Sequence, residues 1–148
     1  MYKNILVASD GSDLALQGVE HGLTLAKMLG ADVTIITVSE PMHQEAVRAA
    51  QTAGVDDAVL RYDQQLERAA KERFAFVQER AEAHGVEVNL VHEIDESPAE
   101  AIVRTARLKD CDLIVMSSHG RRGVQKLLLG SQTSEVLVKT SVPVLVIR

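Results

Sequence analysis

Short apolar runs alternate with helix-like segments along all 148 residues, and this alternation constrains the fold of the chain more than any other feature. The runs are rich in β-branched residues, as buried or half-buried strands are. We expect strands at residues 5–8, 33–38, 86–92, 112–117 and 144–147. Strict alternation of strands and helices predicts an α/β fold: an open five-stranded parallel sheet with helices on both faces, as one domain over residues 1–148.

The helices are indicated by apolar residues at steps of three and four and by residues that begin or end helices. We expect helices at residues 15–29, 60–84, 98–108 and 131–139. The clearest start is Ser97-Pro98-Ala99-Glu100, which combines a capping box with proline at the first helical position. Residues 42–59 have no convincing period, so we expect a long connection there, with helical pieces left open.

Composition and charge argue against several classes of protein. The net charge of -5 at pH 7 is unlike that of a nucleic-acid-binding protein, which would carry a basic surface. No apolar run approaches the roughly 20 residues that cross a bilayer, so no membrane-spanning segment is expected. The single cysteine, Cys111, directly precedes an apolar strand and is expected to be a small core residue. A lone cysteine also fits a reducing compartment, and we expect a cytoplasmic protein.

A loop rich in small residues follows the predicted fourth strand, and a second pair of small residues precedes the last helix. The loop begins with Ser117-Ser118-His119-Gly120, and Gly130-Ser131 stands where the last helix starts. Glycine lets the backbone approach a ligand closely, and the unpaired N–H groups of a helix N-terminus favour negative charge. This order of strand, loop and helix start predicts a site that holds phosphate groups.

A second polar loop is expected beside this one. Ser9-Asp10-Gly11-Ser12 follows the first strand, and ligands of open α/β sheets bind outside the carboxyl ends of the strands, where the winding reverses. If the first and fourth strands are neighbours, the two loops flank that point, and Val38 at the end of the second strand lies beside them. Asp10 also fits a plain turn residue that stabilises the start of the first helix, and that interpretation stays open.

The same segments carry a resemblance to a known family. The first strand with its acidic turn, the helix start at Ser97, the segment from Cys111 through Gly120 to Gly130-Ser131, and the last strand with Val142-Pro143 resemble the universal stress protein family in its small single-domain form. The resemblance covers essentially the whole chain. It implies a Rossmann-like sheet with the strand order 3-2-1-4-5.

The resemblance also implies ATP as the ligand. ATP-binding members carry a glycine, two residues, a second glycine, nine residues, and then Gly-Ser or Gly-Thr. Gly120, Gly130 and Ser131 match the later positions, whereas Ser117 replaces the first glycine. The serine side chain either obstructs the ligand or donates its hydroxyl to it, and both stay open. Mg²⁺ or Mn²⁺ would be held mainly by the phosphates, since no cluster of metal-ligating side chains is recognisable in the sequence.

Position by position, the resemblance assigns a set of residues to the nucleotide. Asp10 would lie beside the adenine and ribose, with Ala8, Ser9 and Val38 as backbone-contacting neighbours. Around the ribose and phosphates the resemblance places Met116, Ser117, His119, Gly120, Arg121, Gly130, Ser131, Gln132 and Thr133. No catalytic residue is assigned.

These residues predict an ATP-binding stress-response protein, a nucleotide-dependent binding or signalling module with an unidentified protein partner. The last strand, from Val142 to Ile147, is expected at a sheet edge, and the resemblance implies that it pairs with a second copy to form a homodimer. Two alternatives stay open. One is a dimeric interaction protein of the same fold that binds no nucleotide, and the other is an enzyme that hydrolyses nucleotides slowly.

Overall fold

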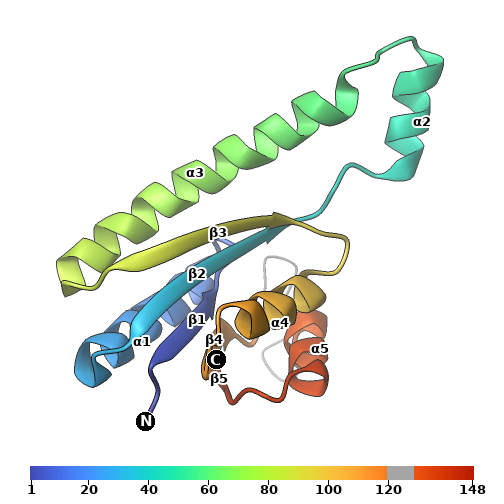
Figure 1. The fold of residues 1–148 in the computed structure, drawn as a ribbon. Helices are drawn as coiled ribbons and strands as arrows, with labels where there is room; N and C mark the ends of the chain where they lie inside the picture. Colours follow the sequence, from blue (N-terminus) through green and yellow to red (C-terminus); the bar gives the residue numbers. More distant parts are fainter. Residues whose placement is uncertain (120–128) are drawn as a thin grey trace.

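Figure 1 shows the fold of the protein in a computed structural model, which describes residues 1–119 and 129–148. In the described residues the elements are β1 (Asn4–Ala8), α1 (Asp13–Leu29), β2 (Asp32–Ser39), α2 (Gln44–Thr52), α3 (Ala58–His84), β3 (Val88–Ile94), α4 (Pro98–Leu108), β4 (Leu113–Ser117), α5 (Ser131–Lys139) and β5 (Val144–Ile147). Each predicted strand and helix is present, and its ends differ from the prediction by at most two residues.

The strands form a parallel sheet in the order β3-β2-β1-β4-β5, which confirms the predicted order. The chain winds from β1 outward to β3, then crosses to β4 on the other side of β1 and continues to β5 (Figure 1). The winding therefore reverses between β1 and β4. Open α/β sheets bind ligands at the carboxyl ends of the strands beside such a reversal.

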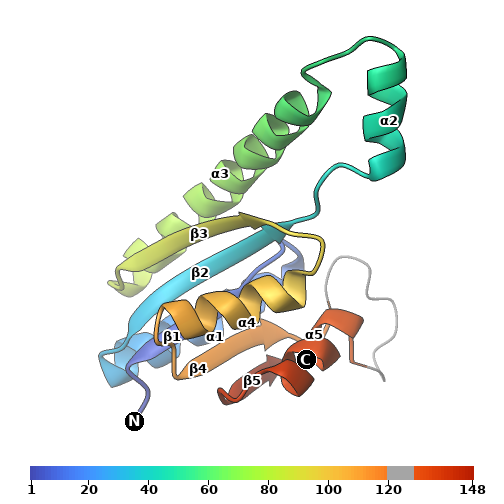
Figure 2. The same cartoon turned by 45° about the vertical axis from the view of Figure 1, so that its right-hand side comes forward.

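The core has two layers because successive side chains of a strand point to opposite faces of the sheet. On one face, Ile5 and Val7 of β1 pack in a cluster with residues of α1 and α3. On the other face, Leu6 packs in a cluster with residues of α4 and α5. Figure 2 shows α4 in front of the sheet and α1 behind it, so the predicted coverage of both faces is confirmed.

The helix ends follow the signals in the sequence. The Ser12 hydroxyl accepts a hydrogen bond from the Ala15 N–H at 3.2 Å and begins α1, and Gly30 ends it in the left-handed conformation. Ser97 begins α4 in the same way, with its hydroxyl 3.3 Å from the Glu100 N–H. Cys111 is buried in the layer beneath α4, and burial raises the pKa of its thiol to about 11, as expected of a structural core residue.

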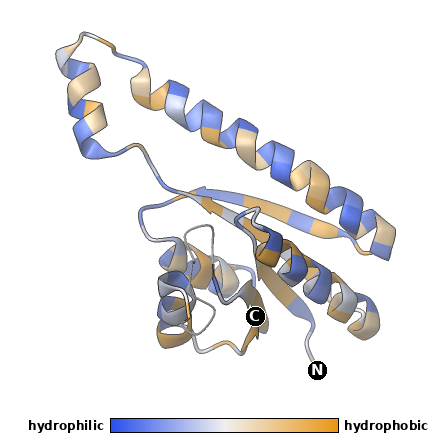
Figure 3. Cartoon of the chain, turned by 180° about the vertical axis from the view of Figure 1, so that it is seen from behind, coloured by the Kyte–Doolittle hydropathy of each residue, from blue (hydrophilic) through white to orange (hydrophobic). Residues whose placement is uncertain are grey.

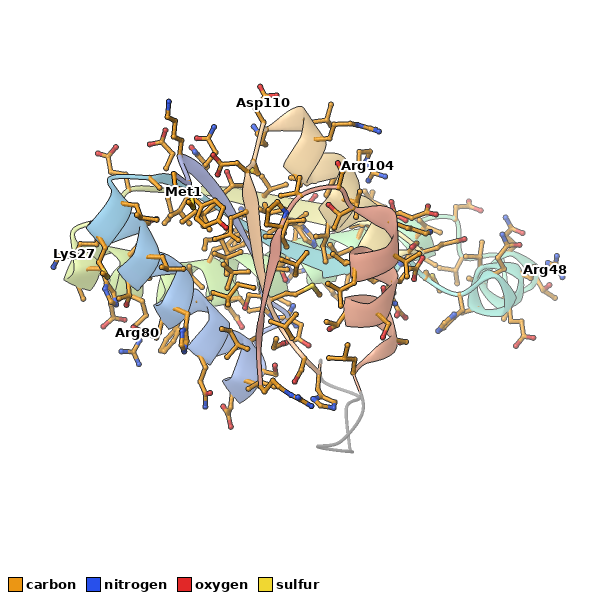
Figure 4. All side chains as sticks on the ribbon, turned by 90° about the horizontal axis from the view of Figure 1, so that it is seen from below. Met1, Lys27, Arg48, Arg80, Arg104 and Asp110 are labelled. Atoms are coloured by element: carbon orange, nitrogen blue, oxygen red, sulfur yellow. The ribbon has the colours of Figure 1, made fainter. Side chains whose placement is uncertain are left out.

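α2 and the first turns of α3 extend beyond the sheet as a projecting arm (Figures 1 and 2). No residue of α2 is buried, and the labelled side chain of Arg48 lies far from the sheet in Figure 4. Figure 3 shows hydrophobic colours concentrated on the strands and mixed colours along α3.

In the described part of the chain, no helix is both long and apolar enough to cross a membrane.

Candidate functional site

A small cavity of about 100 Å³ opens at the carboxyl ends of β1, β2 and β4, between the sheet and the starts of α4 and α5. Its lining consists of Ala8, Ser9, Asp10, Ile36, Val38, Pro98, Ile102, Met116, Ser117, Gln132 and Thr133. The cavity lies where the winding of the sheet reverses, as the sequence predicts.

The floor of the cavity is apolar because of strand alternation. Ile36 and Val38 of β2 and Met116 of β4 belong to or pack against the core layer beneath α4 and α5. Ile102, one turn into α4, closes the side. A flat apolar group fits such a lining better than a charged one does.

The turn after β1 forms one rim of the cavity. Its backbone is fixed by the Ser9 N–H, which donates to the Ile36 carbonyl at 2.9 Å. The Asp10 carboxylate accepts a hydrogen bond from the Ser12 N–H at 2.9 Å, and Gly11 has a positive φ of 81°. Asp10 is therefore a turn residue at the start of α1, and the same turn holds it against the cavity.

Ser117, which stands where the resemblance expects glycine, is buried at 8% exposure. Its hydroxyl donates to the carbonyl oxygen of His119 at 2.7 Å. The next hydroxyl, of Ser118, lies 2.8 Å from Nδ1 of His119. Both serine hydroxyls are thus hydrogen-bonded within the loop, and the Ser117 hydroxyl has a protein partner rather than an open position.

The start of α5 packs tightly on this loop. The Gly130 N–H donates to the Ser118 carbonyl at 2.6 Å, and the Thr133 hydroxyl donates to the Ser117 carbonyl at 2.8 Å. A Cβ atom on Gly130 would lie 3.0 Å from the Ser118 oxygen and 3.4 Å from Cα of His119. Gly130 is therefore needed for close packing between the two segments, whatever ligand binds there.

Gln132 connects α5 to α4. Its side-chain oxygen accepts a hydrogen bond from the Ala99 N–H at 3.0 Å, which lies in the first turn of α4. The first turn of α5 has no acidic residue, and its N-cap Gly130 makes no side-chain capping bond. Ser131, at the first helical position, is exposed.

The structure brings most of the predicted site residues together. The predicted residues that line the cavity are Ala8, Ser9, Asp10, Val38, Met116, Ser117, Gln132 and Thr133. The backbone of Gly130 comes close to that of His119, since a Cβ on Gly130 would lie 3.4 Å from Cα of His119, and Ser131 begins α5. Gly120 and Arg121 lie outside the described residues. Sequence reasoning missed Ile36, Pro98 and Ile102, although alternation along β2 and the predicted start of α4 point to them.

His119 has an unusual environment. Its Nε2 atom is buried and has no hydrogen-bond partner, and it is the one such side-chain atom in the described part of the chain. Within the described ranges 1–119 and 129–148, no group of three or more His, Cys, Asp or Glu side chains is placed to hold a metal ion.

On the other face of β2, the side chains next to Val38 form hydrogen bonds with α3 and with β3. Arg73 donates to the Thr37 hydroxyl at 3.4 Å, and the Ser39 hydroxyl lies 2.9 Å from Nε2 of His92 on β3. Burial is the main cause that lowers the pKa of His92 from its ordinary value of 6.5. The strand that floors the cavity is therefore held from behind by a polar cluster.

The fold and the cavity define the class of this molecule: a doubly wound α/β protein with a small cavity at the point where the winding reverses. Comparison with known families identifies it further. A model of the universal stress protein family matches residues 1–148, and the chain belongs to that family.

Individual relatives agree with this assignment. Universal stress protein MJ0531 of Methanocaldococcus jannaschii is 31% identical over 148 residues, which cover 100% of this chain and 83% of that protein. The solved structure of hypothetical protein MJ0577 superposes with a TM-score of 0.83 at 26% identity, over 99% of this chain and 96% of the other. A universal stress protein solved in complex with cAMP has a TM-score of 0.70 at 23% identity, over 99% and 97% of the two chains.

Proposed function

We propose that the protein binds an adenine nucleotide in the cavity at the carboxyl ends of β1, β2 and β4, and that it acts as a nucleotide-dependent binding or signalling module in the stress response. ATP is the expected form. The single observation that carries the proposal is the composition of this cavity, which has an apolar floor between an acidic turn and a helix start.

Each part of the cavity suits one part of a nucleotide. The apolar slot formed by Ile36, Val38 and Met116 fits the faces of a flat base. The Asp10 carboxylate is an acceptor for ribose hydroxyl groups. The start of α5 offers backbone N–H groups and the positive end of its helix dipole to phosphates. Mg²⁺ or Mn²⁺ would be bound mainly by the phosphate oxygens, as is common for Mg²⁺ in nucleotide sites.

The solved relative that holds cAMP is an instance of this fold with an adenine nucleotide. At 23% identity the likeness supports the fold alone, so the support for a nucleotide in this chain comes from its own cavity.

Calorimetric titration of the purified protein with Mg-ATP, ADP and AMP tests the proposal. Wild-type protein is expected to bind at least one of them saturably. Val38→Trp should weaken binding by roughly tenfold or more, because an indole in a cavity of about 100 Å³ leaves no room for a base.

Val59→Trp is the matched control, since Val59 is 44% exposed on the first turn of α3 and does not line the cavity. This variant should bind like wild type. Absence of saturable binding by folded wild-type protein would contradict the proposed function.

We also propose that β5 pairs with its copy in a second chain to form a homodimer. β5 is an edge of the sheet, and its Val144, Leu145 and Val146 side chains are only half-buried. On the neighbouring helix α5, Val138 is 84% exposed and Leu137 is 40% exposed. An apolar, uncharged edge strand of this kind favours pairing with another strand.

A further inference from the structure

Gln132 occupies an unusual position between the cavity and the start of α4. It is the second residue of α5, it lines the cavity, and its Oε1 accepts a hydrogen bond from the Ala99 N–H at 3.0 Å. Ala99 is fully buried, and its N–H belongs to the first turn of α4, where backbone donors have no partner within the helix. The Gln132 carbonyl oxygen satisfies this donor.

This hydrogen bond determines which atom of the Gln132 side-chain amide is the oxygen and which is the nitrogen. A backbone N–H only donates, so the Gln132 atom that faces it must be the oxygen. The Nε2 group, with its two N–H donors, then forms the other end of the same planar amide. Among residues 1–119 and 129–148 the hydrogen bonds of Gln132 include no acceptor for this group.

The apolar neighbours of Gln132 suit a base better than they suit phosphates. Pro98 and Ile102, on either side of Ala99 along α4, both line the cavity and are apolar. Ser131, by contrast, is exposed at the outer start of α5. Gln132 is half-buried, so its Nε2 group would lose contact with water when a base fills the cavity, and an acceptor on that base would offset this cost.

We propose that Gln132 is a specificity-determining residue of the nucleotide site, and that its Nε2 group donates a hydrogen bond to a ring nitrogen of the adenine base. The inference rests on the proposed function and adds the hydrogen bond through which the site would recognise the base. Adenine carries three unsubstituted ring acceptors, N1, N3 and N7, and each is replaced by C–H in the matching deaza analogue.

Two variants separate this role from a structural one. Gln132→Glu keeps an oxygen acceptor for the Ala99 N–H and adds an acidic group at a helix start, so the fold should be retained while the donor is lost. Gln132→Met has similar length and no charge, and it removes both the donor and the acceptor.

The experiment is calorimetric titration of wild type and both variants with Mg-ATP and with its 1-deaza, 3-deaza and 7-deaza analogues. All four ligands have the same phosphates, so repulsion from the new glutamate cancels in the comparison. One analogue should bind wild type roughly tenfold more weakly than ATP, as expected for one lost hydrogen bond. In both variants the affinities of that analogue and of ATP should be equal.

Two results would overturn the inference while leaving the proposed function intact. One is that wild type binds all three analogues as tightly as ATP. The other is that the penalty for the same analogue persists in Gln132→Met. If wild-type protein binds no Mg-ATP, the proposed function fails and the inference fails with it. Loss of Mg-ATP binding therefore marks failure of the proposed function, whereas retained Mg-ATP binding with either of the two results above marks failure of the inference alone.

Discussion

Gly130 is the residue at which backbone packing leaves the least room for a side chain beside the proposed phosphate site. A side chain at this position would meet the Ser118 carbonyl oxygen at 3.0 Å, and the N–H of Gly130 already donates to that oxygen. The hydroxyls of Ser117 and Thr133 add further bonds within the same two segments. Residues 117–119 and the start of α5 are thus joined by hydrogen bonds within the protein.

Gly130→Ala should therefore destabilise the protein. Its Cβ displaces the Ser118 backbone, and overpacking of this kind costs about 1–3 kcal/mol in the free energy of unfolding. Urea unfolding followed by circular dichroism measures it. Gly18→Ala in α1 is the control, because its Cβ meets nothing closer than 4.0 Å and alanine favours the helix by up to about 1 kcal/mol. Equal stabilities for wild type and Gly130→Ala would contradict the packing described for this loop.

At the scale of elements, the paired ends of β2 and β3 link the cavity to α3. Val38 faces the cavity, while the flanking Thr37 and Ser39 bond to Arg73 of α3 and His92 of β3. The charged groups that face His92 are Glu67 and Arg73 of α3 and its neighbour Glu93. The carboxylates raise its pKa and the arginine lowers it, but burial has the largest effect, so the folded protein favours the neutral ring.

This arrangement predicts a pH dependence of stability. The pKa of His92 in the folded state lies below its ordinary value of 6.5, so its contribution is complete above that value and is lost as the pH falls through the folded-state pKa. Thermal melts from about pH 7 to about pH 5 should show falling stability, and His92→Gln should reduce the slope. His43→Gln, at an exposed position, should leave the slope unchanged. An unaltered slope in His92→Gln would refute this role.

The elements that were predictable from the sequence are those that bury one face. The apolar runs of β1, β2 and β4, the Ser12 and Ser97 helix starts and the glycine ends of α1 and α3 each leave a local signal. α2 buries no residue, although its few apolar residues are segregated to one side, and the prediction for residues 42–59 only left helical pieces open. β3 lies at a sheet edge, where its Leu90 is 38% exposed, and the strand begins and ends two residues later than predicted.

The candidate site was predictable where small or charged residues interrupt an apolar pattern, as at Asp10, Ser117 and Gly130. The apolar lining of the site was harder to predict from the sequence. Ile36 and Ile102 have the appearance of ordinary core residues, and only the positions of α4 and β2 in three dimensions place them against a cavity. The hydrogen bond between Gln132 and Ala99 spans 33 residues along the chain, and no local pattern encodes it.

At the scale of the whole molecule, the two edges of the sheet differ in chemistry. β3 carries His92 and Glu93 and lies in contact with α3, whereas β5 consists of the apolar residues Val144–Ile147. Charged side chains on an edge strand discourage pairing, and their absence favours it. The arm formed by α2 and the first turns of α3 lies toward the β3 side in Figure 1, away from β5.

Light scattering coupled to size exclusion should therefore give twice the mass of one chain. Val146→Lys places a charge on the half-buried edge strand β5 and should shift the protein toward the monomer. Circular dichroism would verify that the variant is folded. A wild-type mass of one chain at every concentration, or a fully dimeric Val146→Lys variant, would contradict pairing through β5.

The proposed function depends on what occupies the cavity between Asp10, Val38 and Met116. A crystal structure of the protein grown with Mg-ATP tests this most directly. We predict the adenine in the slot between Val38 and Met116, with the phosphates at the start of α5 beside Gly130 and Ser131. An empty cavity at saturating ATP, or a nucleotide bound elsewhere on the surface, would contradict the central claim.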